Sequence, residues 1–209
     1  MWFPSLADDH RWAAAQEHLA GCSPRLAAII RRIGPCTLRP RKDYFVVLCK
    51  AIYTQQISTV VAGVLFARFR QQFPRLRPTP ELVLKIIGDV ELMRACGLSR
   101  QKQKYIRDLA EHFATRRIPT RRLAAMDDEQ VIETLTQVNG IGRWTAEMFL
   151  IFTLNRPDVL PVDDFGLQKA AQTVFNLRAL PDAKKLRKLA EPWKPWRSIA
   201  TWYLWRGTA

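Results

Sequence analysis

The chain has 209 residues, 48% of them hydrophobic, which is enough to bury a sizeable core and argues against a disordered chain. Its 33 Lys and Arg residues against 19 Asp and Glu give a net charge of +14, which favours a polyanionic partner. Apolar runs are too short to span a membrane, and the first residues lack the pattern of a secretory signal, so we expect no membrane association and a cytoplasmic, nucleoid-associated protein.

The predicted elements are all helical. Apolar residues recur at three- and four-residue spacing between short Pro, Gly and Asp breaks, and no segment alternates as a strand would. We expect Ser58 to cap one helix and Asp127 or Asp128 another. In chain order, the expected helices span residues 6–20, 24–33, 42–54, 57–72, 79–86, 89–95, 99–115, 127–137, 143–154, 165–176, 182–191 and 195–206.

Cysteine and histidine spacing gives no sign of a metal centre, a cluster or a disulfide framework. The cysteines never form a C-x-x-C pair, and the three histidines are scattered, so we expect no metal and no cofactor. Residues 181–197 hold six basic side chains against Asp182 and Glu191. This run fits a solvated helix face as well as a surface for nucleic acid.

A tight turn separates the helices expected at 127–137 and 143–154. Gly140 and Gly142 permit positive φ and leave backbone N–H groups uncovered at the start of the second helix, where a phosphate oxygen could bind. From the glycines alone, a plain αα-hairpin with a glycine C-cap is the better interpretation.

The residues that follow the turn change this interpretation. The segment Gly140-Ile-Gly-Arg-Trp-Thr-Ala146, with Leu160-Pro-Val-Asp-Asp164 after it, resembles the helix-hairpin-helix, Gly/Pro-rich loop and aspartate signature of DNA glycosylases. Residues 51–58, 97–105 and 191–198 are similar to one branch, the 3-methyladenine DNA glycosylase II family. The resemblance covers residues 45–206.

The resemblance implies a bilobal, all-α helix-hairpin-helix glycosylase fold in one compact unit, residues 1–209. Residues 52–155 would form the helix-hairpin-helix lobe, and residues 1–51 with 156–209 the second lobe, with the active site in the cleft between them. Longer family members begin with a mixed α/β domain, which we expect this sequence to lack.

Asp164 is the catalytic residue that the resemblance implies, with Asp163 as a neighbour or a cap. A fixed anion near C1′ would stabilise the positive charge that develops on the sugar as the base leaves, and it could align or deprotonate the attacking water. A lone aspartate here is better interpreted as the N-cap of the helix beginning at Phe165, and the two roles are compatible.

The resemblance also assigns residues to the DNA. Trp144 and Trp205 would be aromatic walls of the base pocket, with Met148 on the same side. An alkylated purine is cationic, so such walls would add a cation–π attraction. The wedge that fills the gap left by a flipped base would be Gln56, with Gln55 or Ile57 as alternatives, unless these are simply exposed loop residues. Phosphate binding would fall to the hairpin residues Gly140, Ile141, Gly142 and Thr145.

The hairpin also bears on strand cleavage. Members of this fold that cut the strand carry a lysine two residues after the second glycine, where this sequence has Trp144, and Arg143 cannot act as an amine nucleophile.

The resemblance therefore implies a monomeric, monofunctional N-glycosylase that excises alkylated purines from double-stranded DNA by base flipping and Asp-assisted hydrolysis, in base excision repair. A silent helix-hairpin-helix DNA-binding protein and a glycosylase/lyase for oxidised bases are the alternatives.

Overall fold

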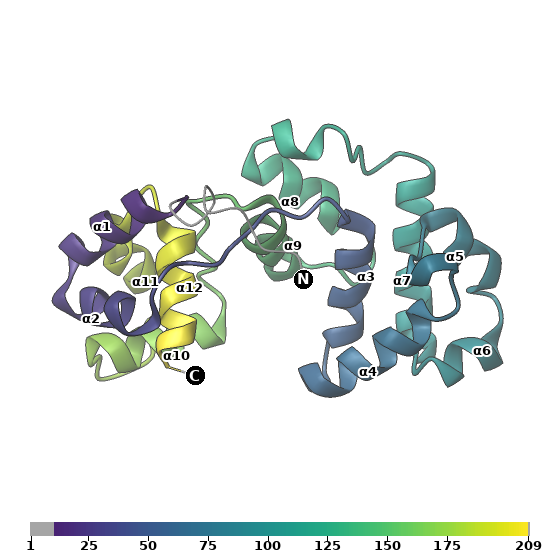
Figure 1. Cartoon of the computed structure of the whole chain (residues 1–209), viewed down its shortest axis with the longest axis horizontal. Helices are drawn as coiled ribbons and strands as arrows, with labels where there is room; N and C mark the ends of the chain where they lie inside the picture. The colour runs from purple at the N-terminus through teal and green to yellow at the C-terminus, as the bar shows by residue number, and fades with distance from the viewer. Residues whose placement is uncertain (1–10, 209) are drawn as a thin grey trace. The chain divides into compact units, whose positions relative to one another are not determined.

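The computed structural model describes residues 11–208, which form helices and turns without a β-strand, as predicted (Figure 1). Short 3-10 turns lie at Pro74–Leu76, Leu123–Ala125 and Glu191–Trp193, and a π-helical segment, Leu150–Leu154, continues α9. The α-helices are α1 (Ala13–Cys22), α2 (Pro24–Ile33), α3 (Tyr44–Thr54), α4 (Thr59–Arg70), α5 (Pro80–Ile86), α6 (Val90–Ala95), α7 (Arg100–Ala114), α8 (Asp128–Thr136), α9 (Arg143–Phe149), α10 (Phe165–Phe175), α11 (Ala183–Leu189) and α12 (Arg197–Gly207).

The predicted helices agree with these bounds to within a few residues, except at the first helix. It was expected over 6–20 but spans Ala13–Cys22, and the part of the expected range before residue 11 lies outside the described residues. The predicted caps are confirmed at Ser58, which accepts from the amide of Val61, and at Asp127. Asp127, not Asp128, caps α8, because its side chain and that of Gln130 form a reciprocal capping box.

The chain divides into two compact units. The hairpin unit is Arg41–Leu154, and the terminal unit combines Met1–Pro40 with Asn155–Ala209. The hairpin unit begins at Arg41, whereas the predicted lobe began at residue 52. The reason is that the whole of α3 packs on α7 and α4. The rings of Phe45 and Phe113, for example, meet edge to face at 5.2 Å.

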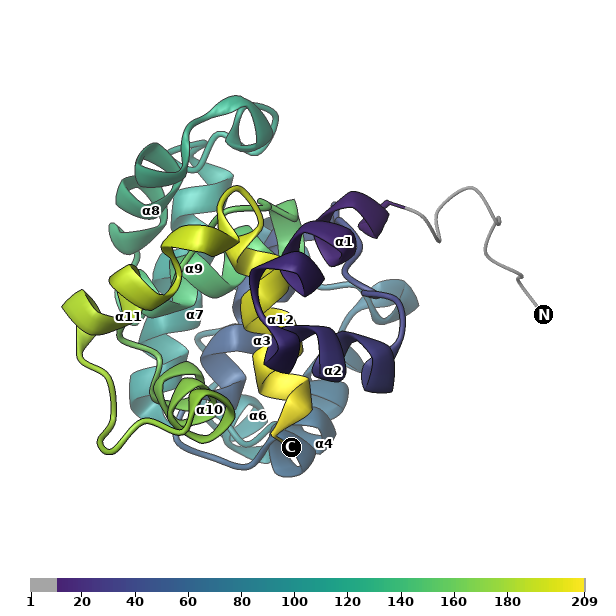
Figure 2. The ribbon, with the colours of Figure 1, turned by 90° about the vertical axis from the view of Figure 1, so that its left-hand side faces the viewer.

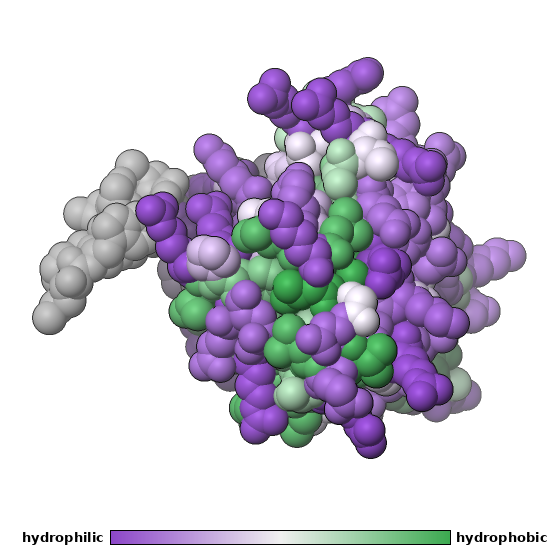
Figure 3. Space-filling view, turned by 90° about the vertical axis from the view of Figure 1, so that its right-hand side faces the viewer, coloured by the Kyte–Doolittle hydropathy of each residue, from purple (hydrophilic) through white to green (hydrophobic). Residues whose placement is uncertain are grey.

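In the hairpin unit, α3 and α7 lie side by side (Figure 1). An aromatic cluster fills the space between α3 and α4: the ring of Tyr53 lies 5.3 Å from Phe66 and 5.5 Å from Phe69, which contacts Phe73 at 4.9 Å. One outer face of this unit carries an apolar patch among hydrophilic side chains (Figure 3). The core of the unit is thus built mainly from the faces of α3, α4 and α7.

In the terminal unit, α12 is the central helix, in contact with α1, α2 and α10 (Figure 2). Its residues Ser198–Leu204 are all buried, which explains why this stretch is apolar on nearly every side. A Cβ on Gly207 would lie 3.0 Å from the side chain of Ile29, so the close approach of α12 to α2 depends on that glycine.

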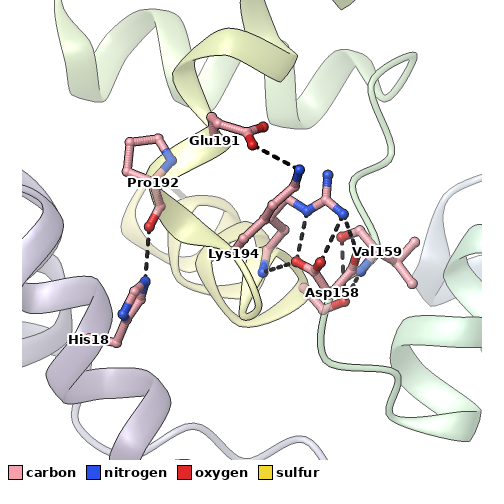
Figure 4. Close-up of polar contacts among 8 residues, drawn as sticks. His18, Asp158, Val159, Glu191, Pro192 and Lys194 are labelled. Atoms are coloured by element: carbon pink, nitrogen blue, oxygen red, sulfur yellow. Dashed lines mark hydrogen bonds and ion pairs between the residues drawn. The ribbon is translucent and has the colours of Figure 1, made fainter.

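Polar contacts fix the segment before α12 (Figure 4). Arg197 binds the carboxylate of Asp158 through Nε at 2.7 Å and Nη2 at 2.9 Å, and the Pro192 carbonyl meets the ring of His18 at 2.9 Å. Lys194 pairs with Glu191 at 2.8 Å. Two of the six basic residues in 181–197 therefore have internal partners, whereas the four on α11 (Lys184, Lys185, Arg187 and Lys188) are exposed.

A bilayer-spanning helix would need a longer apolar stretch than any helix of the described residues contains.

We expect Arg197→Met to lower the free energy of unfolding by about 1–3 kcal/mol, because it leaves the part-buried carboxylate of Asp158 without its bidentate partner. Lys194→Met is the matched control: its ion pair is exposed, so the change should stay within about 0.5 kcal/mol. Urea denaturation of both variants measures the difference, and equal losses would contradict the structural role given to Arg197.

Candidate active site and nucleic-acid interface

The turn between α8 and α9 depends on Gly140. Its φ of +85° favours glycine, and a Cβ there would lie 2.3 Å from the ring of Tyr105. The carbonyl of Gly140 accepts a hydrogen bond of 2.7 Å from Gln55 Nε2. On the other side of the turn, Asp108 accepts from both the amide (2.7 Å) and the side chain (2.9 Å) of Asn139. The hairpin is therefore held by contacts with Tyr105 and Asp108 of α7 and with Gln55 at the end of α3.

Gly142 plays a different part from the one expected. Its φ is −93°, so it does not use the positive φ that a glycine permits. It is the N-cap of α9, and a Cβ built on it meets nothing within 4 Å. A side chain would therefore project into open space before the first turn of α9, which is where a phosphate would approach the helix amides.

Ile141 and Thr145 are parts of the turn's framework. The amide of Ile141 donates to the carbonyl of Val138, and its side chain is buried. The side chain of Thr145 is buried as well. The first hydrogen bond of α9 runs from the Ala146 amide to the Gly142 carbonyl, so the helix ladder begins there. Phosphate binding at the start of α9 stays a prediction.

Arg143 ties the two helices of the hairpin together. Its guanidinium forms a bidentate pair with Glu129 on α8 and lies 3.3 Å from Glu147 on its own helix. The hydrogen bonds from Arg143 lower the pKa of Glu129. Both partners are largely exposed at this pair, so its contribution is to the hairpin's geometry more than to stability.

The loop after α3 carries the predicted wedge. Gln56 is exposed and has a φ of +59°, which is uncommon for a residue other than glycine. Lys102 donates 2.8 Å bonds to the carbonyls of Tyr53 and Gln55, the end of α3, and desolvation lowers the pKa of this ammonium. Gln55 itself is held to Gly140, so Gln56 and Ile57 are the residues that this loop presents to solvent.

Three residues on α7 that support this site were not singled out from the sequence. Lys102, Tyr105 and Asp108 are spaced three apart, which places them on one helix face. Lys102 meets the wedge loop, Tyr105 lies under Gly140, and Asp108 holds Asn139. Polar residues at this spacing, in and beside the stretch 97–105, were the available signal, but only the fold shows what they contact.

The predicted base-pocket residues fall into two groups. Trp144 and Met148 lie one turn apart on the hairpin unit's α9, with 49% of Trp144 exposed and Met148 half-buried. Trp205 belongs to α12 of the terminal unit. The structure thus brings Trp144 and Met148 together, and it brings Trp205 to Asp164.

Asp164 is the N-cap of α10. Its Oδ1 accepts a 2.5 Å bond from the Leu167 amide and a 3.0 Å bond from the indole Nε1 of Trp205. The expectation that this carboxylate caps the helix is confirmed. Asp163 is exposed, and the neighbouring Phe165 is an aromatic residue at 63% exposure that the sequence reasoning missed.

Gly166 makes the approach of Trp205 to Asp164 possible. A Cβ at this position would lie 3.1 Å from Asp164 Oδ1 and 3.4 Å from Trp205 Nε1, so a larger residue would press on both atoms of the hydrogen bond. The carboxylate is consequently fixed in place by its own helix and by an indole from α12.

Residues 49–195 match the family described as HhH-GPD superfamily base excision DNA repair protein. The chain belongs to this superfamily. A member from Schizosaccharomyces pombe, DNA-3-methyladenine glycosylase 1, is 36% identical over 201 residues, covering 92% of this chain and 86% of that protein. Another from the same organism, an alkylbase DNA glycosidase-like protein, is 32% identical, with 96% of each chain covered.

Solved structures of the superfamily agree with the fold. The S. pombe 3-methyladenine DNA glycosylase in complex with abasic DNA superposes with a TM-score of 0.81 at 34% identity, covering 92% of this chain and 95% of that one. The Bacillus halodurans DNA-3-methyladenine glycosidase also gives 0.81, at 33% identity and coverages of 93% and 89%. The predicted family and its helix-hairpin-helix fold are therefore confirmed.

Two glycine substitutions separate folding from phosphate binding. Gly140→Ala should lower the free energy of unfolding by about 2–4 kcal/mol, because it combines a positive φ with a clash against Tyr105. Gly142→Ala should cost less than about 1 kcal/mol but weaken binding to an abasic duplex about tenfold, because its methyl group would stand before the amides of α9. Thermal melts and fluorescence anisotropy measure the two effects. Unchanged DNA affinity in Gly142→Ala would exclude phosphate binding at this turn.

Proposed function

We propose that the chain is a monofunctional DNA N-glycosylase that excises alkylated purines of the 3-methyladenine type from double-stranded DNA in base excision repair. The observation that carries the proposal is the fixed carboxylate of Asp164, held by the Leu167 amide and the Trp205 indole. The glycosylases of similar sequence, and the neighbour crystallised with abasic DNA, support this substrate class.

Asp164 would act when the bond between base and sugar breaks. Departure of the base leaves positive charge on the sugar, and a fixed anion stabilises that charge more in the transition state than in the ground state. Both known donors bind the same oxygen, Oδ1, which limits rotation of the carboxylate. The residue would thus be preorganised for the charge and for orienting the attacking water.

The hairpin unit would position the DNA. The amides that begin α9 would bind a phosphate of the lesion strand without reading its sequence. Gln56 would fill the space left by the flipped base, and its strained backbone conformation supports such a role. Trp144 and Met148 would contact the extruded base, whose positive charge when alkylated favours aromatic neighbours. We propose the same role for Trp205. All of these residues belong to one chain, so we propose that a monomer acts.

Asp164→Asn tests the catalytic assignment. The amide oxygen still caps α10 and still accepts from Trp205, so only the charge is removed. We expect the release of 3-methyladenine from methylated duplex DNA to fall by about 10²-fold or more, with binding to an abasic duplex retained.

The control is Asp163→Asn. This substitution removes the same charge from the neighbouring position, which is exposed. It should release base at the wild-type rate. If neither the wild type nor any variant releases a base although all bind DNA tightly, the chain is the silent helix-hairpin-helix binder and Asp164 is only a helix cap.

We also propose that the enzyme does not cut the DNA strand. The position that would carry a Schiff-base lysine is Trp144, and Arg143, its neighbour, is engaged by Glu129. Borohydride added during base release should therefore trap no covalent protein–DNA adduct, and the abasic product should break only on alkali treatment. A trapped adduct, or incision without alkali, would favour the glycosylase/lyase alternative.

A further inference from the structure

A basic hollow lies in the hairpin unit away from the turn. It has a volume of about 730 Å³, formed by the start of α3, the residues before and at the start of α5, and the end of α7. A second hollow of about 480 Å³ adjoins it, because Phe113, Thr120 and Arg121 line both. Together they make one concave surface, called here the distal hollow, whose basic residues are Lys42, Arg77, Arg116, Arg121 and Arg122.

The charge of the distal hollow is not balanced by its own carboxylates. Two acids line it, Asp43 and Glu81. Asp43 is already engaged by the bidentate guanidinium of Arg41, at 3.0 and 2.7 Å, which lowers the pKa of this carboxyl, and the charge of Arg77 lowers the same pKa further. None of the five basic side chains forms an ion pair or hydrogen bond with another described residue, and all five are exposed. The surface therefore attracts anions from solution.

The packing of α3 against α7 places this surface at the opposite end of the unit from the hairpin. At one end, Lys102 contacts the last turn of α3 and Tyr105 lies under Gly140. At the other end, Phe113 meets Phe45 beside the hollow. A helix rises about 1.5 Å per residue, so the eight residues from Tyr105 to Phe113 separate the two ends by about 12 Å. The 11 residues of α3 span about 16 Å.

The side chains of the distal hollow suit an extended polyanion better than a small anion. The cations are long, exposed and spread over two adjoining hollows, and Tyr44, Thr79 and Thr120 line the same surface. Exposed arginines of this kind bind phosphates along a nucleic-acid backbone, positioning it without reading bases.

We propose that the distal hollow binds the phosphate backbone of a second duplex DNA segment while the hairpin holds the first. This inference rests on the proposed function for its ligand, duplex DNA. A protein that contacts two segments passes directly from one to the other, so the distal hollow would speed the transfer of the enzyme between stretches of DNA during its search for lesions.

The test follows dissociation of the full chain from a fluorescent abasic duplex while unlabelled undamaged duplex is added at constant ionic strength. For the wild type, the dissociation rate should rise with competitor concentration, by about fivefold over the range, because a bridged complex forms before release. The triple variant Arg77→Ala/Arg116→Ala/Arg121→Ala should show a rate that no longer depends on competitor.

The matched control removes the same charge elsewhere: Arg31→Ala/Arg94→Ala/Arg178→Ala, three exposed arginines outside the distal hollow. It should keep the wild-type dependence on competitor. Single-turnover base release should be unchanged in both triple variants.

Several outcomes would overturn the proposal. They are a wild-type rate independent of competitor, a distal variant that still responds, a control that loses the response equally, or slower base release in the distal variant alone. A final experiment replaces the competitor duplex with tripolyphosphate at the same phosphate concentration. If tripolyphosphate raises the dissociation rate as much as the duplex does, the hollow binds small anions instead. If the wild type transfers between duplexes but releases no base, the proposed function is contradicted and this inference still holds.

Discussion

The backbone of Gly140 lies directly on the ring of Tyr105, and the geometry of the α8–α9 turn and of the loop beside it depends on this contact. A side chain at that position has no room, so the turn can be tight only with glycine there. Once the turn is seated, its carbonyl meets Gln55, and the loop that carries Gln56 is joined to the hairpin. Lys102 completes the arrangement by donating hydrogen bonds to the carbonyls of Tyr53 and Gln55 at the end of α3. The turn proposed to bind phosphate and the loop proposed to carry the wedge are thereby parts of one supported structure.

In the terminal unit, a different set of residues holds the side chain of Asp164 in place. A helix N-terminus needs a cap, and the catalytic role proposed for Asp164 needs a fixed carboxylate; one oxygen of Asp164 accepts both hydrogen bonds that serve these needs. The indole that binds this oxygen comes from α12, which is buried along most of its length and therefore well fixed. The absence of a side chain at Gly166 allows the indole to come close. The same contacts that surround the cap of α10 also hold the Asp164 carboxylate in one orientation.

The basic character of the chain is divided among distinct places. Some of it is structural: Arg197 holds Asp158, and Arg143 joins α8 to α9 through Glu129. Some of it forms no ion pair or hydrogen bond with the side chains that the structure describes, above all the exposed arginines of the distal hollow at the far end of α3 and α7. Net charge alone therefore measures affinity for polyanions poorly, since only the unpaired, exposed part of it faces a ligand.

The sequence by itself determined the helices, their caps and the family. Periodicity and capping residues are local, so α2 and the cap at Ser58 could be placed without tertiary information, and the cap of α8 could be narrowed to Asp127 or Asp128. The tertiary structure decided what depends on packing between residues far apart in the sequence. It shows that Gly140 and not Gly142 has a positive φ, that the Ile141 amide bonds within the turn, and that Trp205 binds Asp164. Lys102 and the distal hollow belong to the same class, because residues far apart in sequence meet there only when α3 and α7 pack side by side.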